Sequence, residues 1–310
     1  MIRRPPRSTL DRSSAASDVY KRQRFLEEEM VAPVATCGGS AANTIVGLSN
    51  LGAKCGFIGK VKDDRAGKQF KRSMEGLNII FETPPNTEGE PTAKCLIFVT
   101  PDAQRSMNTF LGASTELRPL DIPKDFIGRS KILYLEGYLW DPPNAKKAFL
   151  EAINIAKAAD RKVALSLSDA FCVDRYRSEF LDLVRTHVDI LFGNETELLS
   201  LYQVENLNKA IGLVQDDCEI VAVTRDSRGS IVIENRRVFE IAAQKIDTVI
   251  DTTGAGDLYA SGFLYGITRD MDIRQCGRLG GLVASSIITQ FGARPEESLM
   301  PLIDRVAVPN

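Results

Sequence analysis

The sequence is poor in the features that mark several common classes of protein. Its 310 residues include one histidine, one tryptophan and six cysteines, and 39 basic side chains nearly balance 41 acidic ones. No run reaches the roughly 18 apolar residues that span a bilayer, so we expect no membrane partner. A net charge of −2 leaves no basic surface of the kind that binds nucleic acids, and we expect no nucleic-acid partner. What remains, 44% apolar and 26% charged residues, is typical of a globular protein.

The cysteines and the histidine are scattered along the chain. The cysteines stand at positions 37, 55, 95, 172, 218 and 276 without a C-x-x-C pair, which is typical of reduced thiols and favours a cytoplasmic location. Zinc prefers gathered imidazole and thiolate ligands, so this distribution argues against a zinc site. No G-x-S-x-G elbow presents a serine for a hydrolase triad, and we interpret His187 as structural.

The first 24 residues differ from the rest of the chain in charge. They carry seven basic and two acidic side chains, which gives +5 against −7 for residues 25–310. An organelle transit peptide is one reading, but Pro5 and Pro6 interrupt the cationic amphipathic helix that it needs. We expect residues 1–24 to be a foreign or disordered segment, similar to translated adapter sequence, joined to a truncated reading frame.

Alternating helical and strand-like segments follow and predict an α/β fold with one large core. Short apolar runs separated by helical segments are typical of a parallel sheet with right-handed crossovers. Residues 92–99 and 105–111 instead alternate between apolar and polar side chains around a Pro-Asp turn, which predicts an exposed antiparallel flap. The other expected strands cover residues 55–59, 131–137, 162–167, 188–194, 219–224 and a hairpin at 230–241. The expected helices cover residues 40–51, 64–75, 144–159, 176–186, 195–214, 255–268 and 272–290.

The chemistry concentrates in the segment DTTGAGD, residues 251–257. Gly254, Ala255 and Gly256 lead into a helix, so their backbone N–H groups can converge at the positive end of the helix dipole and bind an anion. Asp257 in the first turn can equally cap the helix. A plain cap does not need two glycines and an alanine, which leave the amides open to a phosphate. The segment therefore predicts a phosphate site with an ionised carboxylate beside it.

This segment and three others resemble the ribokinase/phosphofructokinase-B carbohydrate kinases, a family that includes adenosine kinase-like members. The resemblance covers residues 34 to about 300, and residues 251–257 are similar to the C-terminal signature of the family. It implies that Asp257 is the catalytic base, which takes the proton of a primary hydroxyl, and that residues 254–256 stabilise the transferring phosphoryl group. It also places nucleotide contacts at Asp251 and Thr252.

A second similar segment, residues 38–67, matches the N-terminal signature of the family. There Gly38, Gly39 and Asn43 stand at positions that contact substrate hydroxyls. Arg105 aligns with a flap arginine that reaches the phosphates in adenosine kinase-like members, and a solvated arginine at the flap edge is the alternative.

The remaining two segments concern the metal ion and the nucleotide. Asn194 and Glu197 fit the N-x-x-E element that organises magnesium and its waters, although Asn followed three residues later by Glu is also a capping box. Thr224 and Gly229 belong to a strand-end turn similar to the one that meets the nucleotide phosphates.

The resemblance implies a ribokinase-like fold in one kinase domain over residues 25–310. A central, mostly parallel sheet is flanked by helices, and a small antiparallel lid covers about residues 79–112. The implied cofactors are ATP and Mg²⁺, and some relatives also need a monovalent cation such as K⁺, for which we look to Asp251. We expect a small sugar or nucleoside as partner, with the protein as a monomer or as a homodimer formed through the lid.

The substrate class is the most open question. Tyr138, Trp140 and Phe171 are candidates to stack on an adenine, although aromatic residues near strand ends more often pack in the core. Together with the segments GGSAAN and RSMNTFLGAS, they favour an adenosine-like substrate. A dinucleotide-binding oxidoreductase is disfavoured because no G-x-G-x-x-G follows a strand, whereas a non-catalytic sugar- or nucleoside-binding homologue stays open.

The chain also departs from the family pattern. Family members begin with a core strand and an aspartate that holds substrate hydroxyls, and neither is recognisable before Cys37. Lys62 replaces a glycine common in the family. Because an uncovered sheet edge is costly against a stability of about 5–15 kcal/mol, we expect this chain to fold poorly or to bind its substrate weakly.

Overall fold

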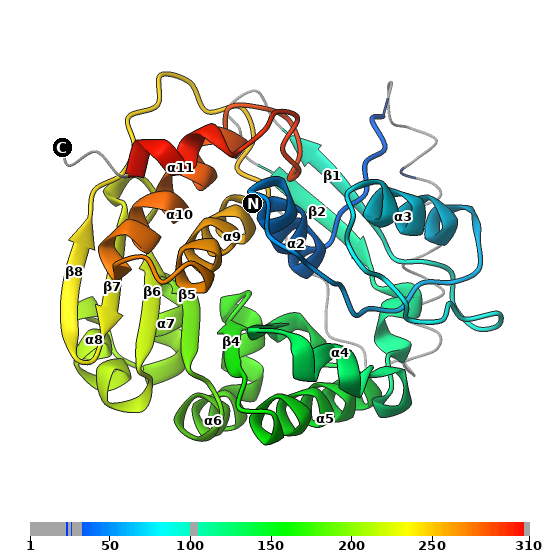
Figure 1. The fold of residues 1–310 in the computed structure, drawn as a ribbon, viewed down its shortest axis with the longest axis horizontal. Coiled ribbons are helices and arrows are strands. Elements are labelled where there is room, and N and C mark those ends of the chain that lie inside the picture. The colour runs from blue at the N-terminus through cyan, green and yellow to red at the C-terminus, as the bar shows by residue number, and fades with distance from the viewer. Residues whose placement is uncertain (1–22, 24–25, 27–32, 100–104, 307–310) are drawn as a thin grey trace, which may run out of the picture.

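The computed structural model describes residues 33–99 and 105–306, together with Gln23 and Leu26. A six-stranded sheet has helices on both faces, and a two-stranded sheet lies beside it with helix α3 (Figure 1). The strands of the larger sheet are β3 (Ile132–Glu136), β4 (Lys162–Ser166), β5 (Ile190–Asn194), β6 (Ile220–Thr224), β7 (Ser230–Glu234) and β8 (Arg237–Ile241). The helices are α2 (Ser40–Asn50), α3 (Arg65–Gly76), α4 (Lys124–Arg129), α5 (Pro143–Ala158), α6 (Ala170–Thr186), α7 (Glu195–Tyr202), α8 (Leu207–Asp217), α9 (Ala255–Thr268), α10 (Ile273–Ile287) and α11 (Pro301–Val306).

The order of the six strands follows the chain from β3 to β8. Strands β3 to β6 are parallel, and β6, β7 and β8 are antiparallel. Helices α5 to α8 connect the parallel strands, as the alternation in the sequence predicts. Parallel strands end at the same edge of a sheet, so the last residues of β3, β4, β5 and β6 meet there: Glu136, Ser166, Asn194 and Thr224.

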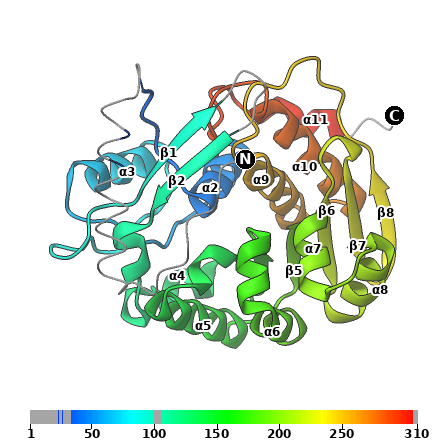
Figure 2. The ribbon, with the colours of Figure 1, turned by 180° about the vertical axis from the view of Figure 1, so that it is seen from behind.

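Successive side chains of each strand point into two different cores. In β4, Val163 and Leu165 pack on the side of α5 to α8, whereas Ala164 packs on the side of α2, α9 and α10. Figure 1 and Figure 2 show α5 and α6 on one face of the sheet and α9 and α10 on the other. Burial on both faces explains why these strands read as continuous apolar runs in the sequence.

Glycines bring α2, α9 and α10 into close contact. A Cβ at Gly47 would collide with Ser261 and Leu258 of α9, and a Cβ at Gly262 would lie 2.8 Å from the backbone oxygen of Leu279 in α10. Backbones can approach this closely only where no side chain intervenes. The packing of α2 against α9 fixes where the two helices begin, and these ends form the site described below.

The smaller sheet pairs β1 (Lys94–Val99) with β2 (Arg105–Phe110) in antiparallel register. This confirms the expected flap strands, while the Pro-Asp turn between them lies outside the described residues. Helix α3 is capped by Asp64, which accepts from the backbone N–H of Gly67 at 2.7 Å. Its Phe70 packs edge-on against Phe81 beneath this part of the molecule.

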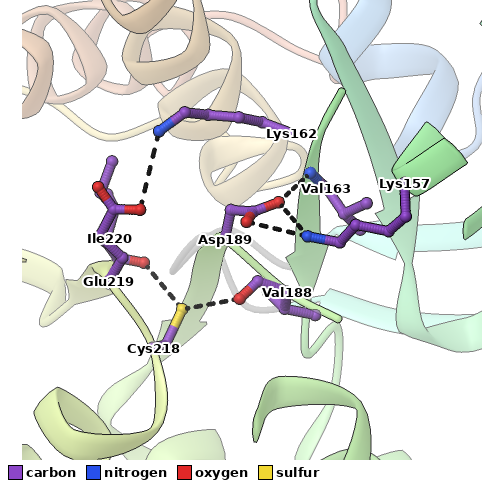
Figure 3. Close-up of polar contacts among 8 residues, drawn as sticks. All are labelled: Lys157, Lys162, Val163, Val188, Asp189, Cys218, Glu219 and Ile220. Atoms are coloured by element: carbon purple, nitrogen blue, oxygen red, sulfur yellow. Dashed lines mark hydrogen bonds and ion pairs between the residues drawn. The ribbon is translucent and has the colours of Figure 1, made fainter. Parts of the chain in front are cut away.

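Polar contacts hold the other edge of the large sheet, where the parallel strands begin (Figure 3). Asp189, before β5, accepts from the backbone N–H of Val163 at 2.6 Å and from Lys157 at 2.8 Å. The thiol of Cys218 donates to Val188 and Ile220. These contacts connect α5, β4, β5 and β6 at the edge opposite the four strand ends.

Several expected elements have different bounds. The helices expected over residues 195–214 are α7 and α8, which extends to Asp217, and Gln203 with a left-handed φ of 52° ends α7. Helix α6 begins at Ala170, earlier than expected, and contains non-helical dihedrals at Tyr176. The expected strand 55–59 is only an isolated bridge between Gly56 and Ile80.

Residues 33–39 carry no regular secondary structure, and β3 pairs with β4 alone among the described residues. No helix in the described part of the chain is long and apolar enough to cross a membrane.

Candidate active site

Two helices begin side by side at the edge where the parallel strands end. Ser40, the first residue of α2, donates from its hydroxyl to Asp257 Oδ1 at 2.6 Å, and Asn43 Nδ2 donates to Asp257 Oδ2 at 2.9 Å. Further along, Gly47 of α2 faces Ser261 of α9, so the helices run in the same direction. The positive ends of both helix dipoles therefore converge on the Asp257 carboxylate.

Glycines shape the turn before α9, in which the N–H of Ala255 donates to the carbonyl oxygen of Thr252 at 3.3 Å. Gly254 is the N-cap residue, with a left-handed φ of 82°, and a Cβ there would lie 2.6 Å from the Cβ of Ala293. Gly256 is exposed, and a Cβ there would meet no protein atom within 4 Å. Gly254 is thus required by the turn itself, whereas Gly256 leaves open space at the end of the helix. Such an end is suited to bind an anion.

Asp251 fixes this turn to the loop after α10. Its Oδ1 accepts from the backbone and hydroxyl of Thr253 at 2.8 and 2.6 Å, and its Oδ2 accepts from the N–H of Gly292 at 2.9 Å. The side chain is 3% exposed. In the structure, Asp251 therefore holds the two loops together, and Thr252 lies half-buried between Asp251 and the turn at residues 254–256.

A buried glutamate that the sequence analysis missed lies beneath Asp257. Glu136 ends β3, is 4% exposed, and accepts from Ser168 Oγ at 2.5 Å and from Tyr134 OH at 3.1 Å. Burial, and secondly the charge of Asp257, raise the pKa of Glu136 to about 7. The signal in the sequence was a carboxylate that ends a buried apolar strand, directly before Gly137.

Asn194 and Glu197 make the capping box that was their alternative interpretation. The Glu197 N–H donates to Asn194 Oδ1 at 2.8 Å, and Glu197 Oε2 accepts from the Asn194 N–H at 3.0 Å. Burial raises the pKa of Glu197 to about 7. In the described part of the chain, no three His, Cys, Asp or Glu side chains gather to hold a metal ion by themselves. One carboxylate and an amide nevertheless suit Mg²⁺, which keeps several waters and completes its shell with substrate phosphates.

The structure also brings the strand-end turn to this edge. Thr224 ends β6 and is the register partner of Asn194 on β5. A Cβ at Gly229 would collide with the carbonyl oxygen of Ile241, and its φ is 82°, so this glycine is needed for the turn into β7. Asp226, between them, has a left-handed φ of 51°.

The other expected site residues are more dispersed. Gly38 and Gly39 are exposed just before α2, and a Cβ at Gly38 would meet no atom within 4 Å. Arg105 starts β2, and the structure does not describe its side chain. His187 caps the C-terminal end of α6, at the opposite edge of the sheet.

One aromatic candidate is in the core. Trp140 is 3% exposed, packs edge-on against Phe149 at 5.1 Å, and donates from Nε1 to Glu179. The expectation that Trp140 stacks on a base is therefore wrong, because its ring already packs in the core. Tyr138 is 46% exposed and Phe171 82% exposed, so both rings have a free face.

Comparison with known proteins agrees with this geometry. Residues 17–299 match the model of the pfkB family of carbohydrate kinases. The crystal structure of an adenosine kinase from Sinorhizobium meliloti is 45% identical, with a TM-score of 0.90, and the match covers 93% of this chain and 88% of that one. The 5-dehydro-2-deoxygluconokinase of Listeria monocytogenes is 28% identical over 96% of this chain and 93% of its own.

A more distant structure shows the same fold. A candidate ribokinase II from E. coli, solved in complex with ATP and Mg²⁺, is 17% identical to this chain with a TM-score of 0.79. The match covers 89% of this chain and 94% of that one. The ribokinase-like fold expected from the sequence, with a mostly parallel sheet and a small antiparallel one, is confirmed. The chain belongs to the pfkB family of carbohydrate kinases, and it is a kinase of the class that acts on sugars and nucleosides.

Proposed function

We propose that this kinase transfers the terminal phosphoryl group of ATP to a primary hydroxyl of an adenosine-like nucleoside, with Asp257 as the general base. The observation that carries the proposal is the position of Asp257, partly exposed at the joint N-termini of α2 and α9 and directly after the glycine-containing turn of residues 254–256. An acceptor alcohol beside this carboxylate would lie next to an anion-binding helix end.

The reaction requires positioning and charge stabilisation more than covalent chemistry. Phosphoryl transfer has a loose transition state with charge spread over the phosphoryl oxygens, and backbone N–H groups of residues 254–256 would donate to them. Asp257 would accept the hydroxyl proton, a general-base contribution of about 10²- to 10⁴-fold. Ser40 and Asn43 hold both carboxylate oxygens of Asp257 in place.

The Asn43 side-chain oxygen can accept a hydrogen bond from the substrate. Asn43 is 5% exposed, its Nδ2 donates to Asp257, and its Oδ1 has no hydrogen-bond partner among the described residues. A buried acceptor without a partner costs about 1–3 kcal/mol, which a substrate hydroxyl that donates to it would recover. Gly38 and Gly39, exposed one turn away, leave room for the sugar.

We assign the cofactor contacts to the surrounding residues. ATP phosphates would lie at the α9 N-terminus beside Thr224, and Asn194 and Glu197 would hold Mg²⁺ through its waters. Magnesium supplies charge neutralisation of the phosphates when it is bound. A monovalent cation, where it is needed, would lie beside the turn that Asp251 holds.

The proposal for the substrate rests on the free faces of Tyr138 and Phe171 and on the 45% identity to an adenosine kinase. ADP release should be measured with ATP, Mg²⁺ and a panel of adenosine, other nucleosides, and hexose and pentose sugars. We expect the highest kcat/KM with adenosine. A sugar preferred over adenosine would contradict the substrate assignment, and calorimetric binding without ADP release would indicate a non-catalytic homologue.

A further inference from the structure

An ion pair lies across the edge where the parallel strands end. Arg228 Nη2 donates to Glu195 Oε2 at 2.5 Å. Glu195 begins α7 directly after β5, and Arg228 lies in the short turn Asp226–Arg228 between β6 and β7. The pair is thus formed by two segments that are separate in the sequence and adjacent at this edge of the sheet.

The pair spans the end of β6, beside which the nucleotide phosphates are proposed to bind. Thr224 ends β6, and its register partners are Asn194 on β5 and Ser230 on β7. Neighbouring strands lie about 4.8 Å apart, so β5 and β7 are about 10 Å apart at this edge. A side chain that reaches from Arg228, two residues before Ser230, to Glu195 therefore passes across the end of β6.

The turn keeps its shape without the Arg228 side chain. The backbone N–H of Arg228 donates to the carbonyl oxygen of Arg225 at 3.0 Å. The N–H of Gly229 donates to Asp226 at 3.1 Å, and the N–H of Arg225 closes the turn by donating to Gly229 at 2.8 Å. Arg225 also reaches Glu240 on β8 with its own guanidinium group. The side chain of Arg228 is therefore not needed to hold this turn to the sheet.

Glu195 is likewise not needed to cap α7. Asn194 and Glu197 form the capping box at the start of this helix. The helix dipole stabilises a carboxylate in the first turn, so Glu195 keeps its charge with or without Arg228 beside it. The side chain of Glu195 is 26% exposed and that of Arg228 is 61% exposed, so water reaches both ends of the pair. An exposed pair of this kind changes an equilibrium by no more than about 5-fold and is easily separated.

Arg228 has the donors that a phosphate chain requires. A guanidinium group has five N–H donors in a rigid fork that fits two oxygens of one phosphate. The bond to Glu195 uses one nitrogen of this fork. A phosphate at the end of β6 would lie beside the exposed guanidinium group. Without Arg228, the charge of Glu195 would instead repel a nucleotide from these strand ends.

We propose that Arg228 binds the phosphate chain of the nucleotide, and that Glu195 holds its guanidinium group in the free enzyme and releases it when the nucleotide binds. The pair keeps the charge across β6 balanced until the phosphates arrive. Arg228 then exchanges one anionic partner for another, and Glu195 is left solvated at the start of α7. The inference rests on the proposed function, because the nucleotide phosphates must lie beside Thr224 for this exchange to take place.

The first test removes the guanidinium group. Arg228→Met should raise the Kd of ATP about 10-fold, measured by calorimetry with Mg²⁺ and without acceptor, since a hydrogen bond to a charged group contributes this much. The KM of the acceptor should not change. Arg228→Lys keeps the charge but not the fork and should give a smaller rise. An unchanged Kd of ATP in Arg228→Met would overturn the proposal.

The second test removes the competing carboxylate. Glu195→Gln frees Arg228 from its charged partner and should lower the Kd of ATP by up to about 5-fold. Arg228→Met and Glu195→Gln should therefore shift the Kd of ATP in opposite directions. If the pair only held the turn in place, both variants would weaken ATP binding, and that result would overturn the proposal.

The double variant separates exchange from simple repulsion. In an Arg228→Met background, Glu195→Gln should lower the Kd of ATP less than it does in the wild type, because there is no pair to break. An equal effect in both backgrounds would show that Glu195 only repels the nucleotide, and this would overturn the exchange.

Arg185 and Asp217 form a matched ion pair at the opposite edge of the sheet. Arg185 Nε lies 3.1 Å from Asp217 Oδ2, and the two side chains are 54% and 16% exposed. Arg185→Met should leave the Kd of ATP unchanged, and a rise similar to that in Arg228→Met would overturn the proposal. A wild type that neither binds ATP nor releases ADP with any acceptor would instead refute the proposed function, so the two failures are distinguishable.

Discussion

Replacing Gly256 with alanine adds a single methyl group at the proposed phosphate site. An added Cβ meets no protein atom within 4 Å, so the folded protein has room for it. Alanine is a better helix former than glycine by about 0.5–1 kcal/mol, and we expect Gly256→Ala to be as stable as the wild type or slightly more stable. The methyl group would occupy the space through which a phosphate approaches the amides.

The expected loss of activity is large by comparison. Removing one donor from an oxyanion-type hole costs about 10²- to 10³-fold in kcat, and a methyl group that holds the phosphate away should cost a similar amount. Steady-state ADP release gives kcat, and urea unfolding gives the free energy of unfolding. Stability and activity should therefore change in opposite directions in this variant.

Gly254→Ala is the matched comparison, two residues earlier in the same turn. Its φ of 82° costs alanine about 1–2 kcal/mol, and the Cβ would lie 2.6 Å from that of Ala293, so this variant should lose stability as well as activity. A folded Gly256→Ala protein with wild-type kcat would show that the open space beside Gly256 is not the phosphate site.

Three further outcomes follow from the structure. Lys60 and Asp121 form a buried ion pair at 2.7 Å, so Lys60→Met should cost about 3–5 kcal/mol in urea unfolding, and an unchanged midpoint would contradict this. Gly47→Ala forces a methyl group against Ser261 and should cost about 1–3 kcal/mol, with wild-type stability as the contrary result. Glu197→Gln can keep the bond to the Asn194 N–H, so it should stay folded but need more Mg²⁺ for half-maximal activity; an unchanged Mg²⁺ titration would remove Glu197 from the metal site.

Features set by local backbone chemistry were predictable from the sequence. The glycines at residues 254 and 256 mark the start of α9, and the continuous apolar runs define strands buried on both faces. The capping box of Asn194 and Glu197 was likewise readable from its spacing. Each of these depends on a few neighbouring residues, so short segments contain the information.

Features set by tertiary packing were not predictable in this way. The Trp140 ring is buried because it packs against Phe149 and Phe180, which lie on two different helices. Glu136 is buried near Asp257 because α2 packs against both β3 and α9, which no short segment of the sequence shows. No local pattern marks the left-handed Gln203 that separates α7 from α8, because a non-glycine residue in this region is held by its surroundings.

The kcat of Asp257→Asn, measured with saturating ATP and acceptor, shows directly whether this carboxylate is the general base. Asparagine preserves the shape of the side chain and its contacts with Ser40, but it cannot take a proton at neutral pH. We expect a loss of about 10²- to 10⁴-fold in kcat, with calorimetric binding of ATP and acceptor retained. An unchanged kcat in a folded Asp257→Asn protein would show that this carboxylate is not the base.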